Sequence, residues 1–175
     1  MEKILKMLGK FIKRMINKEY FSKDVYEFLL ALKKHSVKFV LIGGEAVIYY
    51  GHPRLTGDID IFYEISDENI ANLWNALSDF WDNNIPIIKS KEEFSKPGIV
   101  IQFGLPPNRI DLINKIEGVE FPEVWDGKVC EKLELGGGKT EDIFLIGLKE
   151  LIKNKESAGR HKDLDDVKYL KKIEK

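Results

Sequence analysis

Two aspartates, Asp58 and Asp60, stand two positions apart in the short stretch of residues 57–62. The strict alternation of this stretch predicts a β-strand, in which residues i and i+2 point to the same face of the sheet. The Cα atoms of the pair would lie roughly 7 Å apart, so both carboxylates can converge on one site. Ile59 and Ile61 would point the other way, into the core.

A third aspartate, Asp111, repeats this arrangement between Ile110 and Leu112. Clustered carboxylates are unfavourable unless protons or cations neutralise them, and hard oxygen ligands suit Mg²⁺ rather than Zn²⁺. We therefore expect Asp58, Asp60 and Asp111 to hold magnesium as two ions, with Mn²⁺ as an alternative. In phosphoryl-type transfer, two such ions roughly 4 Å apart activate an attacking hydroxyl and stabilise leaving pyrophosphate. Taken alone, an Asp-Ile-Asp pair is more often a solvated strand edge or an Asx turn.

Gly43 and Gly44 follow a strand-like run and precede a helical one. Backbone N–H groups at such a turn can face a polyphosphate, and the helix dipole favours its negative charge. Many strand-to-helix turns, however, use glycine only for a positive φ. The conjunction of the glycines with the acidic pair is what favours phosphate binding.

Arg54 and Thr56 precede the acidic pair in a loop that contains Pro53. Arginine can reach phosphate from such a loop, and threonine can hold a turn through its hydroxyl. For Thr56 we rank the structural role above the catalytic one. His52 is interpreted as a surface residue and left out of the catalytic set.

The expected elements combine helices with a short mixed sheet, an α+β pattern. In chain order they are a basic amphipathic helix over residues 2–17, a helix from Ser22 toward His35, a strand over 37–42, a helix over 45–50, a strand over 57–62, a helix from Ser66 to Phe80, strands over 99–103 and 109–113, a helix from Thr140 to about Asn154 and a helix over roughly 160–173. We expect one domain, 1–175, with an N-terminal helix within 1–20, a catalytic sheet core over about 37–135 and C-terminal helices over about 140–175.

The bulk composition limits the classes of protein and partner. With 175 residues, 43% hydrophobic and 33% charged, the chain can bury one sizeable core. The single Cys130 cannot form an internal disulfide, and no run is apolar enough for a signal peptide or a membrane span. We expect a cytoplasmic protein with no membrane partner. A net charge of -1 argues against a generally cationic nucleic-acid surface.

Two blocks of the sequence resemble a known superfamily. The first is residues 41–47, LIGGEAV, followed by Gly51, Arg54 and TGDID at 56–60. It resembles the signature of the polymerase-beta-like nucleotidyltransferases, closest to small members grouped with AbiEii-type toxins and lincosamide-type transferases. The second block contains residues 145–149, LIGLK, and residues 159–164, GRHKDL, with Asp166. It is similar to the C-terminal Lys-Arg-Lys-Asp-Leu-x-x-Asp motif of these members.

The resemblance implies roles for the quoted residues. Asp58 and Asp60 would be metal ligands, and Asp111 would be the third carboxylate that assists deprotonation of the acceptor. The expected nucleotide-binding residues are Gly43, Gly44, Arg54, Thr56, Lys149, Arg160 and Asp163. Within this set, Lys149 would meet the phosphates of a nucleoside triphosphate (NTP), and Arg160 and Asp163, with Asp166, would fix the C-terminal helix. One departure is that classical members of the superfamily have serine after the first glycine, where this chain has Gly44. A hydroxyl contact to phosphate is therefore absent, and backbone N–H groups would make the contact instead.

Three functions follow as expectations. The first is metal-dependent transfer of a nucleoside monophosphate from an NTP to a hydroxyl acceptor, either a small molecule, a tRNA or a protein, with release of pyrophosphate. The second is an inactive member of the same fold that acts as a binding partner in a toxin–antitoxin or regulatory pair. The third, a nucleic-acid binding module without chemistry, would need a strongly basic face.

Overall fold

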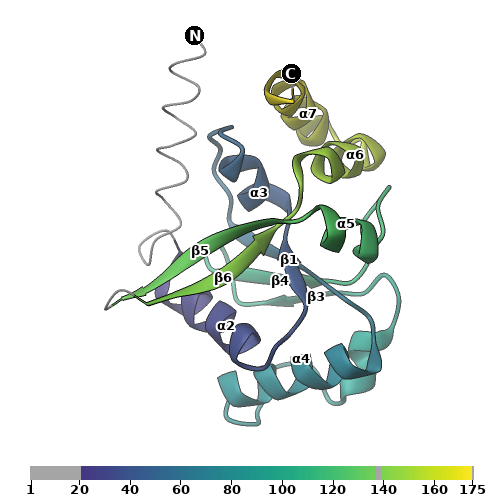
Figure 1. Ribbon diagram of the computed structural model, residues 1–175. Coiled ribbons are helices and arrows are strands. Elements are labelled where there is room, and N and C mark those ends of the chain that lie inside the picture. The colour runs from purple at the N-terminus through teal and green to yellow at the C-terminus, as the bar shows by residue number, and fades with distance from the viewer. Residues whose placement is uncertain (1–20, 137–138, 175) are drawn as a thin grey trace.

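The computed structural model describes residues 21–136 and 139–174 and contains one six-stranded mixed sheet (Figure 1). The basic helix expected over residues 2–17 lies outside the described residues. The strand order is β3-β4-β2-β1-β6-β5. The strands are β1 (Phe39–Leu41), β2 (Asp58–Tyr63), β3 (Val100–Phe103), β4 (Arg109–Ile113), β5 (Val129–Gly136) and β6 (Lys139–Leu145).

The pairing of the strands alternates between parallel and antiparallel. β2 is parallel to β4 and antiparallel to β1, and β3 closes one edge antiparallel to β4. β1 is parallel to β6, which forms an antiparallel hairpin with β5 at the other edge. The predicted α+β class with a mixed sheet is confirmed.

Helices cover both faces of the sheet (Figure 1). Helices α2 (Lys23–Lys34) and α4 (Asp67–Phe80), with the 3-10 turn η1 (Lys91–Ser95), pack on one face. Helices α3 (Gly43–Tyr49), α5 (Phe121–Gly127), α6 (Leu148–Ala158) and α7 (His161–Ile173) pack on the other. Ser22 and Ser66 begin α2 and α4 as N-caps, as their sequence predicts, because each hydroxyl accepts an N–H of the first turn.

The helix predicted from Thr140 is wrong, because this segment is strand β6. Thr140-Glu141-Asp142 has the composition of a helix start, but β5 offers a complete antiparallel partner for it. Ile143 and Leu145 are buried on one face, which is the period-two pattern of a strand. The sheet therefore extends to Leu145 rather than ending near residue 135, and the C-terminal helices begin at Leu148.

Alternate residues of the central strands supply two separate cores. Ile59 and Ile61 are buried with α2 and α4, as predicted. Val40 and Phe62 point to the opposite face, where they pack with α3, α5, α6 and α7. The even-numbered aspartates of β2 share this second face. Within the described residues, no helix is long and apolar enough to span a membrane.

Candidate active site

The structure brings the three predicted aspartates together on one face of the sheet. Asp58 and Asp60 lie on β2, and Asp111 lies on the parallel neighbour β4 with its Cα directly opposite that of Asp60. Parallel pairing with this register places all three side chains on the face covered by α3, α6 and α7. The expected convergence of the acids depends on this register, which the sequence does not specify.

Asp111 is buried and fully engaged by two neighbours. Arg109 Nε donates to Asp111 Oδ1 at 2.8 Å, and Arg109 Nη2 donates to Asp111 Oδ2 at 3.0 Å. Gln102, directly opposite on β3, donates from Nε2 to Asp111 Oδ2 at 2.9 Å. Arg109 Nη2 also donates to Asp58 Oδ2, so one guanidinium joins two of the three acids. These hydrogen bonds raise the pKa of Arg109 above its ordinary value, chiefly through Asp111.

Asp60 is partly buried and less well compensated. Burial raises the pKa of Asp60, and the charges of Asp58 and Asp111 raise it further. A hydrogen bond from the backbone N–H of Gly44 and the more distant charge of Lys155 oppose the shift without reversing it. A carboxylate in this state gains from an added cation.

Gly43 allows Asp60 to lie against the start of α3. Its φ is +63°, and a Cβ built at Gly43 would overlap Asp60 Oδ2. The first glycine therefore has two requirements at once, a left-handed backbone and space for a carboxylate. Asp60 thus contacts both glycines, because its carboxylate lies against Gly43 and accepts the backbone N–H of Gly44.

We expect Gly43→Ala to destabilise the fold more than Gly98→Ala does. Both positions have positive φ, which costs alanine about 1–2 kcal/mol, but nothing lies within 4 Å of a Cβ at Gly98. Overlap with Asp60 should add about 1–3 kcal/mol at Gly43. Urea unfolding of the two variants measures this difference, and equal losses would show that Asp60 moves aside freely.

Thr56 fixes Asp58 at the beginning of β2. Its hydroxyl lies 2.9 Å from both the carbonyl oxygen and Oδ1 of Asp58, which supports the structural role assigned to it. A Cβ atom at Gly44 would lie 2.8 Å from the same hydroxyl and 3.7 Å from Arg54 Nη2. A serine at this position would push against Thr56, which gives a local reason for Gly44.

A buried ionic network connects α6, α7 and the loop before β2. Lys155 Nζ lies 2.7 Å from Asp163 Oδ1 and 3.0 Å from Asp166 Oδ2, and all three side chains are almost fully buried. Arg54 Nη1 donates to Asp166 Oδ2 at 2.7 Å, and Arg160 Nε donates to Asp163 Oδ2 at 2.5 Å. Asp163 and Asp166 on α7 are therefore tied to α6 through Lys155.

Lys149 and Lys155 lie differently on α6. Lys149 is exposed, and the six residue steps from Lys149 to Lys155 rotate the side-chain direction by a net angle of about 240° around the helix axis. Lys155 is buried and close enough for its charge to lower the pKa of Asp60. Sequence reasoning missed Lys155, although a lysine among the buried Leu151 and Ile152 of an amphipathic helix is a recognisable signal. It also missed Arg109 and Gln102.

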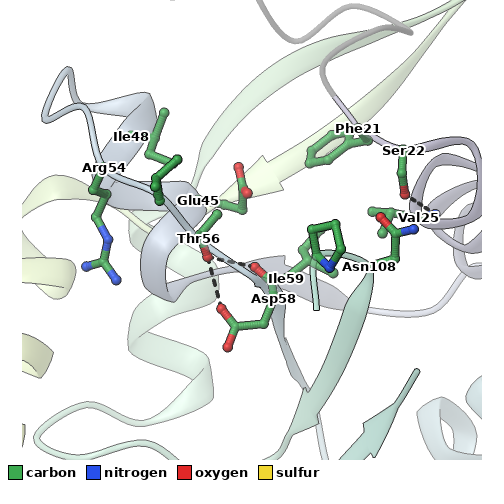
Figure 2. Close-up of a pocket in the computed structure, with 12 residues that line it drawn as sticks. Phe21, Ser22, Val25, Glu45, Ile48, Arg54, Thr56, Asp58, Ile59 and Asn108 are labelled. Atoms are coloured by element: carbon green, nitrogen blue, oxygen red, sulfur yellow. Dashed lines mark hydrogen bonds between the residues drawn. The ribbon is translucent and has the colours of Figure 1, made fainter. Parts of the chain in front are cut away.

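A pocket of about 370 Å³ lies beside the start of β2 (Figure 2). Phe21 and Val25 line it from the α2 side, and Glu45 and Ile48 line it from α3. Asp58 reaches its edge, where Thr56 bonds to the Asp58 carboxylate and backbone. Arg54 also lines this pocket and donates to Asp166, so this arginine connects the pocket with the buried network.

The chemistry of the three acids fits a divalent ion. Their oxygens are the hard ligands that Mg²⁺ and Mn²⁺ prefer, and burial together with the charges of Asp58 and Asp111 raises the pKa of Asp60. In the described part of the chain, however, no three acidic, histidine or cysteine side chains already surround a common point. Arg109 holds oxygens of Asp58 and Asp111 instead.

The mixed sheet, the helix that begins at Gly43-Gly44 and the acids on β2 and β4 define a nucleotidyltransferase-like α+β domain. The family model for a nucleotidyltransferase of unknown function (DUF6036) matches residues 22–173, and the chain belongs to this family. The match includes all of the acids and the buried network. No curated protein matches the chain significantly.

Proposed function

We propose that this protein transfers a nucleoside monophosphate from an NTP to a hydroxyl acceptor and uses Mg²⁺, or Mn²⁺, held by Asp58, Asp60 and Asp111. The single observation that carries the proposal is the register of β2 and β4, which sets Asp111 beside Asp60 on the face shared with Asp58. Membership in a nucleotidyltransferase family supports the general reaction.

In the proposed reaction, the acceptor oxygen attacks the α-phosphorus of the NTP. The bond between this phosphorus and the bridging oxygen to the β-phosphate breaks, and pyrophosphate leaves. Asp111 takes the acceptor proton, and bound divalent metal would supply charge neutralisation to the phosphates. Thr56 keeps Asp58 oriented, and Gly43 leaves space for Asp60.

The proposed phosphate contacts come from the cations beside the acids. Arg54 lies next to Gly44 and is held by Asp166. The hydrogen bond to Asp163 raises the pKa of Arg160, and the charge of Asp60 adds to this shift. Arg160 is exposed, so its guanidinium can turn to an incoming phosphate without leaving a buried site. Lys149 is proposed as a further phosphate contact.

Calorimetric titration of ATP, GTP, CTP and UTP with Mg²⁺ tests the proposal. Wild type should bind at least one NTP, and the Asp58→Asn, Asp60→Asn double variant should bind it at least about 100-fold more weakly, which corresponds to about 2.8 kcal/mol. An Asp82→Asn, Asp165→Asn variant, which removes two exposed carboxylates instead, should bind like wild type.

If no NTP binds, the transferase proposal is wrong. A binding role without chemistry, as one member of a toxin–antitoxin or regulatory pair, would then be the better account.

The Gly43-Gly44 form supports a place near the AbiEii-type toxins and lincosamide-type transferases. The proposed acceptor is a tRNA, a protein or a small molecule.

A further inference from the structure

Arg109 is the cation nearest to the acidic cluster and belongs to the sheet itself. It is the first residue of β4, directly opposite Asp58 in the parallel register and two positions before Asp111. Its side chain therefore leaves the sheet on the same face as the three aspartates. The sequence places it there by the same period-two rule that aligns the acids.

The hydrogen bonds of Arg109 occupy the oxygens that an ion would need. Both oxygens of Asp111 accept from Arg109, and one oxygen of Asp58 accepts from the same guanidinium. The side chain of Asp111 is 6% exposed, whereas that of Arg109 is 27% exposed. Guanidinium remains charged at any ordinary pH, so the contact neutralises the cluster continuously.

We infer that Arg109 is a built-in competitor of the divalent ion for Asp58 and Asp111. It holds the two acids together when the metal is absent, and it leaves them when the metal binds. This inference rests on the proposed metal site. Because part of the Arg109 side chain is open to solvent, it can swing outward, whereas Asp111 stays fixed by Gln102.

The competition predicts that removing the guanidinium tightens metal binding in the absence of nucleotide. Arg109→Gln should bind Mn²⁺ about tenfold more tightly than wild type, a difference of about 1.4 kcal/mol. Arg109→Lys keeps one positive charge but loses the planar guanidinium that donates to both acids. Its Mn²⁺ affinity should lie between those of wild type and Arg109→Gln. Paramagnetic resonance of free Mn²⁺, measured without NTP, gives the three affinities.

A thermal unfolding series separates competition from a purely structural role. Arg109→Gln should unfold at a lower temperature than wild type in metal-free buffer, because three carboxylates lose their nearest cation. Saturating Mn²⁺ should raise its midpoint by more than it raises that of wild type. Lys115→Gln removes an exposed positive charge just after the same strand. It should change neither the Mn²⁺ affinity nor the rise in unfolding midpoint that Mn²⁺ produces.

The outcomes distinguish this inference from the proposed function. If wild type binds Mn²⁺ and Arg109→Gln binds it equally or more weakly, the competitor role is wrong and Arg109 is a structural ion pair. If neither protein binds Mn²⁺, even with NTP present, both the inference and the proposed metal site are wrong.

Discussion

Replacing Asp60 with asparagine is expected to slow nucleotidyl transfer by about 10³-fold. The central acid lies beside both Asp58 and Asp111, so its loss removes a ligand from the middle of the proposed metal site. A bound ion supplies several kcal/mol of charge stabilisation in the transition state, and each 1.36 kcal/mol is a factor of ten in rate. Pyrophosphate release, with Mg²⁺ and the NTP that binds wild type, gives the rate.

The same variant should fold at least as stably as wild type. Burial and the charges of Asp58 and Asp111 raise the pKa of Asp60, so ionising this carboxyl costs more free energy in the folded protein than in the unfolded chain. Asparagine removes the charge and keeps an oxygen for the Gly44 N–H. A thermal midpoint equal to or above that of wild type in metal-free buffer would show that lost activity is not lost structure.

Asp165→Asn is the matched control for this experiment. Asp165 is exposed on α7 and pairs only with Lys168 among the described residues, so the variant should retain the wild-type rate. If Asp60→Asn keeps more than a tenth of the wild-type rate, the three-acid mechanism is wrong.

Replacing Lys155 with methionine is expected to destabilise the protein by about 3–5 kcal/mol. The substitution removes the buried cation that contacts both Asp163 and Asp166, and breaking a buried ion pair by removing one partner is costly even though each aspartate keeps one arginine. Methionine has a similar length and a good helix propensity, so the stability change reports mainly the loss of the positive charge. Urea unfolding at pH 7 measures the change in the free energy of unfolding.

Lys153→Met is the control on the same helix. Lys153 pairs with Glu123 at 2.8 Å, but both side chains are well exposed, so its loss should cost at most about 1 kcal/mol. Equal losses for the two variants would show that the buried network contributes little to stability. The comparison needs no activity assay, so it is independent of the proposed function.

The stability difference between wild type and Lys155→Met should depend on pH in a defined direction. Burial opposes ionisation of Asp163, but hydrogen bonds from Arg160 and Lys155 outweigh it and hold the pKa of Asp163 below its ordinary value. A depressed pKa gives stability that is complete above the unfolded value, about 3.9, and lost as the pH falls through the folded value. The difference between wild type and Lys155→Met should therefore be full at neutral pH and shrink below about pH 4.

The local part of this site follows from short stretches of the amino-acid sequence. Period-two alternation aligned Asp58 with Asp60 and set both against the core residues between them, and the glycine pair marked the turn into α3. Capping serines marked the beginnings of α2 and α4. These features depend on a few neighbouring residues and on backbone geometry, so they can be read without the fold.

The contacts between residues far apart in the chain follow from strand pairing and helix packing. The parallel register of β2 and β4 set Asp111 beside Asp60, and pairing with β5 turned residues 139–145 into a strand against their local composition. Packing of α6 against α7 buried Lys155 rather than Lys149. Such choices follow from pairing and burial across long sequence separations, where the free energy of the whole core outweighs local propensity.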